Sequence, residues 1–222
     1  MATKCSTSMS LCAIRLTRLV PETGYLAAGP NNSYATDALI SLGFDPVVSE
    51  GEDREMRGAC DCMIVQFKAQ DLLKRWNLTL NMGQREPGLE ELLTGAAVIH
   101  DGSNNVIGAN FPAALDCGEA QPAVAVEAWT KAIVGDAQRA DGPYIRWVFP
   151  YTIWTPGGGT LEGGFQQPSF TGSTKSNPVL DLDAIYGDMP AGAADELGPQ
   201  GGWFHDTFIP TSTNCAYQTA SS

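Results

Sequence analysis

Short runs of alternating apolar and polar residues, separated by turn-forming stretches, constrain this chain more than any other feature. The clearest run is 123–134, AVAVEAWTKAIV, and 74–82 and 143–154 show the same alternation. Side chains two residues apart share one face of a strand, so such runs are typical of strands. The sequence also holds 24 glycines and 14 prolines, which interrupt helices and favour turns. We therefore predict a mainly β protein.

A long projecting hairpin is predicted over 37–68, after a first strand at 11–20. Its two strands would be 37–49 and 54–68, and Met63, Val65 and Phe67 would share one face of the second strand. The residues between them, 50–53, read EGED and predict a charged tip that lies outside the core.

One short helix is predicted next. Pro87 stands at its start, a leucine stripe follows, and Gly95 ends it. A tight hairpin is predicted from 96–100 and 105–110. We expect 1–177 to form one domain and 178–222, which is rich in glycine, proline and alanine, to form an extended arm.

Charge limits the partners that the chain can bind. The formal net charge is −12, whereas nucleic-acid binding requires basic residues that displace phosphate counterions. The charge is compatible with a conduit through which DNA passes without adhering. No segment has the length and apolarity of a membrane span, and no signal-peptide core is evident, so we expect folding in a cytoplasm and no membrane partner.

Motifs for catalysis or for cofactor binding are not evident. His100 and His205 are the two histidines, and no G-x-S-x-G elbow accompanies them. The glycines of 157–164 are followed by no Lys-Ser/Thr pair, and Asp181 and Asp183 lack the glycine and glutamate of a calcium loop. Six scattered cysteines predict reduced thiols. We predict no enzyme, cofactor or metal site.

Aromatic residues concentrate in one predicted strand, 143–154. Alternate members of the set could stack on sugars, which makes a carbohydrate-binding β-sandwich module the alternative function. The interpretation that we favour places them in a core and a subunit interface. The set is Tyr144, Trp147, Phe149, Tyr151 and Trp154.

The order of these segments resembles a known family. The segments are FDPVVSEGEDREMRGACDC (44–62), WNLTLN (76–81), PGLEELLTG (87–95), DGSNNVIG (101–108), VEAWTK (126–131) and YIRWVFP (144–150). The set is similar to the major tail tube proteins of long, non-contractile-tailed phages, especially those infecting actinobacteria. The resemblance covers about 11–175. It implies a β-sandwich or barrel of two sheets, with one short flanking helix and a long projecting hairpin.

The resemblance also implies an assembly of hexameric rings, stacked into a virion tail tube around a lumen for the genome. Partners would be further copies of the chain, a tape-measure protein and other tail proteins, while DNA would pass without specific binding. Another tail or head protein, such as a tail terminator, is a further alternative. The hairpin would reach a neighbouring subunit or ring, so the interface candidates are Val47, Val48, Glu50, Glu52, Asp53, Arg54 and Arg57.

Overall fold

The computed structural model is mainly β, as predicted. It describes residues 6–57, 63–111, 120–134, 137–140, 142–158, 167–190, 192–210 and 217–218. Within these residues ten strands form one antiparallel sheet, in the order β14-β2-β1-β9-β11-β12-β6-β3, with β10 on β9 and β13 on β11. The strands are β1 (Thr7–Leu19), β2 (Ser33–Thr36), β3 (Leu39–Ser49), β6 (Leu72–Met82), β9 (Ala123–Val134), β10 (Ala137–Gln138), β11 (Tyr144–Pro156), β12 (Ser169–Thr174), β13 (Gly202–Asp206) and β14 (Tyr217–Gln218).

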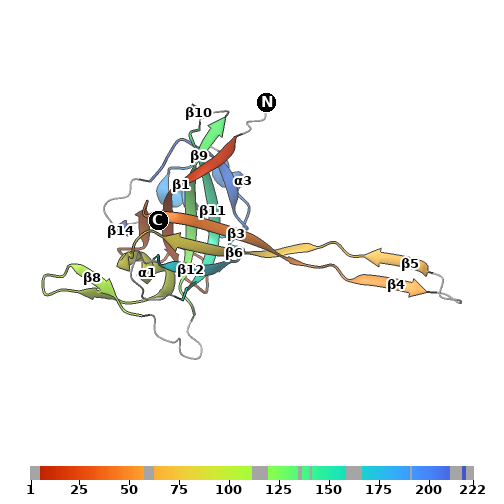
Figure 1. Ribbon diagram of the computed structural model, residues 1–222, viewed down its shortest axis with the longest axis horizontal. Coiled ribbons are helices and arrows are strands. Elements are labelled where there is room, and N and C mark those ends of the chain that lie inside the picture. The colour runs from red at the N-terminus through yellow and green to blue at the C-terminus, as the bar shows by residue number, and fades with distance from the viewer. Residues whose placement is uncertain are drawn as a thin grey trace.

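Two further hairpins leave this sheet in different directions (Figure 1). One pairs β4 (Asp53–Arg57) with β5 (Met63–Lys68), and the other pairs β7 (Val98–His100) with β8 (Val106–Ala109). The second is the tight hairpin that the sequence predicts at 96–110.

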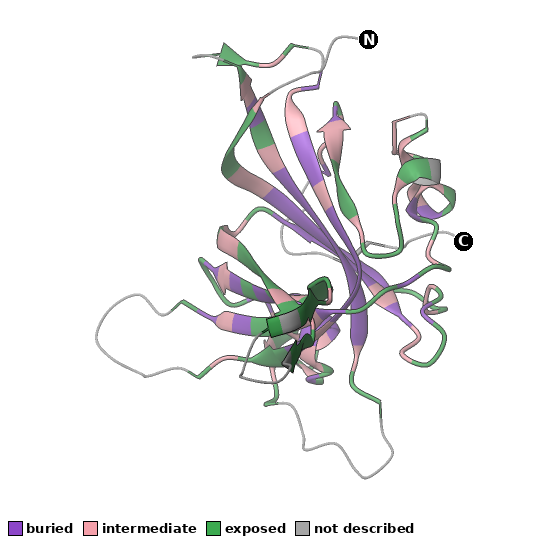
Figure 2. Cartoon of the chain, turned by 90° about the vertical axis from the view of Figure 1, so that its right-hand side faces the viewer, coloured by how far each residue is buried: buried purple, intermediate pink, exposed green. Residues whose placement is uncertain are grey.

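The main sheet curls around its principal core. Phe44 of the edge strand β3 contacts Trp147 of β11, with ring centroids 5.2 Å apart, although β6 and β12 separate these strands in the sheet order. The enclosed face contains the buried alternating residues of β1, β6 and β9. Figure 2 shows the buried residues running along the central strands. The core members include Ile14, Leu16, Leu78, Leu80, Val124, Val126, Phe149 and Trp154.

The predicted helix is α1 (Pro87–Thr94), and it closes one end of this core. Its three leucines, Leu89, Leu92 and Leu93, are buried against the sheet. Gly95 ends the helix in the left-handed conformation, at φ 74°, and its amide donates to the Glu91 carbonyl.

A second core lies on the opposite face of the sheet, because both faces of β9 are buried. The segment after Pro178 covers this face with α2 (Leu182–Tyr186), α3 (Ala193–Glu196) and β13. We expected an extended arm here. Instead β13 pairs with β11, and the α2 residues Leu182 and Ile185 pack beside Ala125 and Val148.

The hairpin predicted over 37–68 is wrong in its pairing. Strand β3 pairs with β6, with Val48 opposite Leu73, and the hairpin β4–β5 is inserted between them. The projecting element therefore runs out along β3 and β4 and returns along β5 and β6 (Figure 1). We call the outer part of it, 47–75, the arm. Strand β12 is not among the predicted strands. It lies between β11 and β6 in the sheet and pairs with both of them.

Candidate assembly surface

The arm consists of two consecutive two-stranded ribbons joined end to end. At the joint, the Ala69 amide donates to the Glu52 carbonyl, and the Gly51 amide donates to the Asp71 carboxylate. A Cβ atom at Gly51 would lie 1.9 Å from the Ala69 carbonyl oxygen, so only glycine allows the two strands to approach this closely.

The interface candidates all lie on the outgoing strand of the arm, along β3, the joint and β4. Val47 is half-buried opposite Arg75, and Val48 is exposed. Glu50, Glu52, Asp53 and Arg54 are exposed as well. Arg57 ends β4 opposite Met63, and its side chain lies outside the described residues.

These acidic residues do not form the predicted tip. Glu50 and Glu52 occupy the joint in the middle of the arm, while the outer connection is 58–62, outside the described residues. Arg54 and Glu52 form an ion pair of 2.7 Å, with both side chains more than half exposed. An exposed pair of this kind contributes about 0–1 kcal/mol, so it orients the side chains without stabilising the arm appreciably.

Exposed apolar side chains are the distinctive feature of the arm. On the outer hairpin, Met56 lies opposite Val65 and Arg54 lies opposite Phe67, so these side chains share a face. Met56 and Phe67 are each 61% exposed. We name as the apolar arm residues Val48, Met56, Met63, Val65, Phe67, Leu72 and Leu73.

A two-stranded ribbon with such side chains has no core of its own. Isolated two-stranded hairpins are marginally stable in water, and contiguous exposed apolar residues mark interaction sites. Burying the exposed half of each apolar arm residue would stabilise a complex by about 1 kcal/mol per residue. The alternation that places Met63, Val65 and Phe67 on one face was visible in the sequence, whereas their distance from any core was not.

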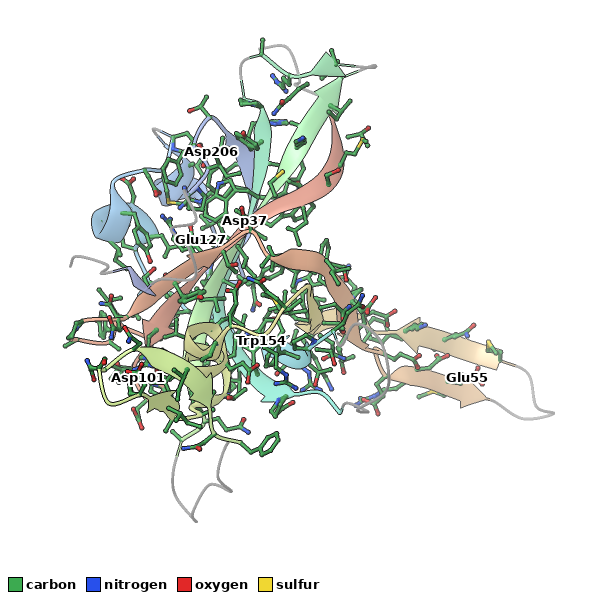
Figure 3. The ribbon with its side chains drawn as sticks, turned by 60° about the vertical axis from the view of Figure 1, so that its left-hand side comes forward. Asp37, Glu55, Asp101, Glu127, Trp154 and Asp206 are labelled. Carbon is green, nitrogen blue, oxygen red and sulfur yellow. The ribbon has the colours of Figure 1, made fainter. Side chains whose placement is uncertain are left out.

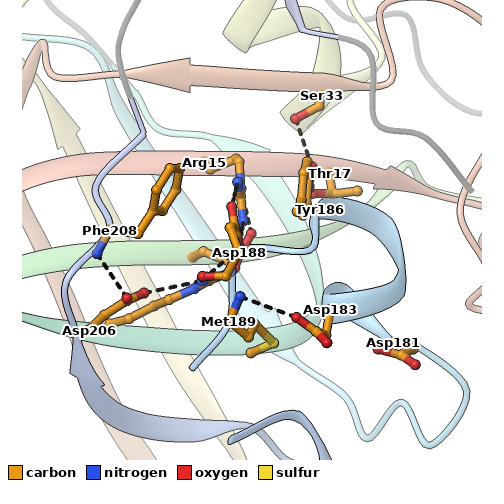
Figure 4. A network of polar contacts seen from close by, with 12 residues as sticks. Arg15, Thr17, Ser33, Asp181, Asp183, Tyr186, Asp188, Met189, Asp206 and Phe208 are labelled. Carbon is orange, nitrogen blue, oxygen red and sulfur yellow. Dashed lines mark hydrogen bonds and ion pairs between the residues drawn. The ribbon is translucent and has the colours of Figure 1, made fainter. Parts of the chain in front are cut away.

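A second concentration of charged groups is buried beneath the C-terminal segment (Figure 4). We call it the ionic cluster, and its members are Arg15, Glu127, Arg146, Asp188 and Asp206. Glu127 lies between the two arginines. It accepts from Arg15 Nε at 2.7 Å and from Arg146 Nε at 2.8 Å, and its side chain is wholly buried.

Two carboxylates of the C-terminal segment complete the ionic cluster. Asp188 accepts from Arg15 Nη1 at 2.6 Å and pairs with Arg146 Nη1 at 2.9 Å, and Asp206 accepts from Arg146 Nη1 at 3.2 Å. The Arg15 guanidinium stacks on the Tyr186 ring, with Arg15 Cζ 3.4 Å from the centroid of the ring. The ionic cluster thus fastens the segment after Pro178 to strands β1, β9 and β11.

The pKa shifts in the ionic cluster follow from these contacts. Burial lowers the pKa of Arg15, but the Glu127 charge and the hydrogen bond to Asp188 outweigh burial and raise it. For Asp188, burial raises the pKa, yet the hydrogen bond from Arg15 and the charges of Arg15 and Arg146 lower it below 3.8. Both shifts favour the charged forms of Arg15 and Asp188, as expected for a structural ion pair.

The ionic cluster is not among the sequence predictions, although the sequence carries a signal for it. Arg15, Glu127 and Arg146 are lone charged residues within the apolar runs CAIRL, AVEAW and YIRWV. A charge in a strand that is buried on both faces requires a charged partner. Recognising this would have required knowing that the C-terminal segment covers the second face.

The residues considered for chemistry take other positions. His100 is exposed on β7, and the His205 ring nitrogen Nε2 lies 3.3 Å from Arg139 Nη1. Asp181 caps α2 by accepting from the Ala184 amide, and Asp183 accepts from the Met189 amide. These two carboxylates therefore stabilise local backbone.

The aromatic residues of β11 do not form an exposed row. Phe149, Tyr151 and Trp154 are buried, and Tyr144 and Trp147 are half-buried. Because a sugar-stacking surface requires exposed ring faces, these positions favour the core interpretation.

No group of three or more His, Cys, Asp or Glu side chains in the described ranges is arranged to hold a metal ion. Of the six cysteines, Cys12 is described and carries a free thiol. Within the described residues, the helices are too short or too polar to span a membrane. The chain matches no protein-family model, and no curated protein sequence matches it either.

Proposed function

We propose that this chain is a structural virion protein that assembles into stacked hexameric rings, forming the tail tube that conducts phage DNA to the host. The proposal joins the family resemblance to one structural observation, which is the arm with its exposed apolar residues. The two-sheet tail tube fold and the other tail proteins as partners belong to the same proposal.

The energetics of the arm support assembly. Seven apolar arm residues at about 1 kcal/mol each supply about 7 kcal/mol per arm, against an association cost of about 4–15 kcal/mol. A single arm contact is therefore weak. A ring closes many such contacts at once, so the assembly gains from multivalency what one contact does not provide.

The charge of the chain suits a DNA conduit. Six copies at −12 each carry −72 per ring. Acidic residues that face the lumen repel the phosphates of the genome, so DNA moves without adhering. The same charge opposes contact between copies, and this makes the apolar arm residues the more important for assembly.

Electron microscopy of the purified chain tests the proposal. We expect six-fold rings or tubes for the native chain. Phe67→Ser should leave the monomer folded, because this side chain is 61% exposed, and should raise the concentration needed for assembly by about tenfold. The matched control Val179→Ser removes an exposed apolar residue of the body. Isolated monomers of the native chain at every concentration would refute the proposal.

A further inference from the structure

We propose that the β7–β8 hairpin of one copy is the surface that receives the apolar arm residues of another copy. This inference rests on the proposed function and deepens it, because it names the surface of the chain that the arm contacts. It is carried by the exposed apolar residues of the hairpin, by the distribution of charge along the chain and by the placement of the two hairpins.

The β7–β8 hairpin carries apolar side chains that are largely open to solvent. Ile107 is 64% exposed, and Ile99 and Val106 are each at least 40% exposed. Strands β7 and β8 form a two-stranded sheet separate from the main sheet. Like the arm, this hairpin is a ribbon whose apolar residues require a partner.

Charge is distributed so that these two regions can meet. The arm, 47–75, carries six acidic and five basic residues and has a net charge of −1, whereas the rest of the chain has 19 acidic and 8 basic residues, a net of −11. The stretch 96–111 contains a single charged residue, Asp101, and no lysine or arginine. Two copies that meet through these regions therefore avoid most of the repulsion between their bodies.

Each region has a net charge of −1, and one pair of opposite charges is available between them, Asp101 and Arg54. The Asp101 carboxylate accepts from the Asn105 side chain and from the amides of Asn105 and Ser103, and these hydrogen bonds lower its pKa. It is thus a fixed, partly exposed negative charge at the turn of the hairpin. On the arm, Arg54, which pairs with Glu52 in its own chain, shares a face of the outer hairpin with Met56, Val65 and Phe67.

The placement of the hairpins requires a contact between different copies. Figure 1 shows β8 and the pair β4–β5 at opposite ends of the long axis, and Figure 3 shows Asp101 and Glu55 on opposite sides of the body. The arm of a copy therefore does not reach its own β7–β8 hairpin. A head-to-tail contact between unlike surfaces propagates until it closes a ring or builds a filament, as an assembling subunit requires.

A charge-exchange experiment tests the pairing. Phe67→Glu and Ile107→Glu each place a charge on one apolar surface, and we expect each to raise the critical concentration for assembly, measured by sedimentation and light scattering. The double variant Phe67→Glu/Ile107→Lys places opposite charges across the proposed contact. We expect its critical concentration to be at least about tenfold lower than that of Phe67→Glu alone, because neighbouring residues in contact are energetically coupled. In the control, Phe67→Glu/Tyr25→Lys, the lysine lies on an exposed residue that is not part of the hairpin and should not recover assembly.

The outcomes separate this inference from the proposed function. If Phe67→Glu blocks assembly and Ile107→Glu does not, the arm docks elsewhere on its neighbour, and the inference is overturned while the proposed function stands. Blocking by both without recovery in the Ile107→Lys double variant, or equal recovery with Tyr25→Lys, also overturns it. Failure of the native chain to assemble overturns the proposed function itself.

Discussion

Replacing Glu127 with glutamine tests the account of the ionic cluster. The substitution keeps the shape of the side chain and removes its charge. In the native chain the carboxylate accepts from the guanidinium groups of both Arg15 and Arg146. A glutamine oxygen can still accept from one arginine, but its amide group then directs hydrogen-bond donors at the other.

The magnitude follows from burial. Glu127 and Arg146 have no exposed side-chain surface, and Arg15 is 3% exposed, so water cannot replace the lost contacts. Breaking a buried ion pair by changing one partner costs about 3–5 kcal/mol, and we expect a loss of that size in the free energy of unfolding. The matched control is Glu52→Gln, whose exposed pair with Arg54 predicts a change of about 0–1 kcal/mol.

Urea denaturation, followed by tryptophan fluorescence in dilute protein, measures both variants. Trp129 reports on the site because the Arg146 guanidinium lies 5.0 Å from its ring. A fall in the midpoint without a change in slope would be a change in stability alone. A loss below about 1 kcal/mol for Glu127→Gln would refute the reasoning, because it would mean that the surroundings resolvate the arginines at little cost.

Three further predictions follow from particular contacts. Gly95→Val should lower the free energy of unfolding by about 1–3 kcal/mol and reduce soluble expression, because Gly95 has φ 74° and a Cβ atom there would lie 2.9 Å from Pro122 Cγ. The control Gly102→Val, at a position with open space around it, should leave the stability nearly unchanged. Asp188 has a lowered pKa, so its contribution to stability is present above pH 3.8 and is lost as the pH falls below that value; Asp188→Asn should remove this part of an acid unfolding curve. Trypsin should cleave 53–68 quickly in dilute protein and slowly in assembled protein, as gel electrophoresis of timed digests would show.

The local elements could be predicted because their signals are local. The proline at the start of α1, its leucine stripe and its terminal glycine lie within nine residues, and the helix forms where they indicate. The strand at 123–134 is β9 with the predicted boundaries. The turn at 101–105 likewise joins a hairpin, since the Asp101 side chain accepts backbone amides within its own loop.

The pairing of distant strands could not be predicted from the same signals. Segments 37–49, 54–68 and 74–82 all alternate, so the pattern leaves open which two of them pair. The joint at Gly51 was interpreted as a turn, because a break in a ribbon and a reversal of the chain favour the same residues. The ionic cluster depends on contacts between residues more than 100 positions apart, such as Arg15 and Glu127. Such contacts leave no local pattern beyond isolated charges in apolar strands.

Sedimentation velocity of the native chain, from micromolar to millimolar concentration, tests the central claim most directly. The account predicts that a single monomer species gives way to multiples of six as the concentration rises, and that Phe67→Glu shifts this change to higher concentration. A monomer boundary that stays unchanged over the whole range, for the native chain and for the variant, would contradict the claim that the exposed arm is completed by copies of the same chain.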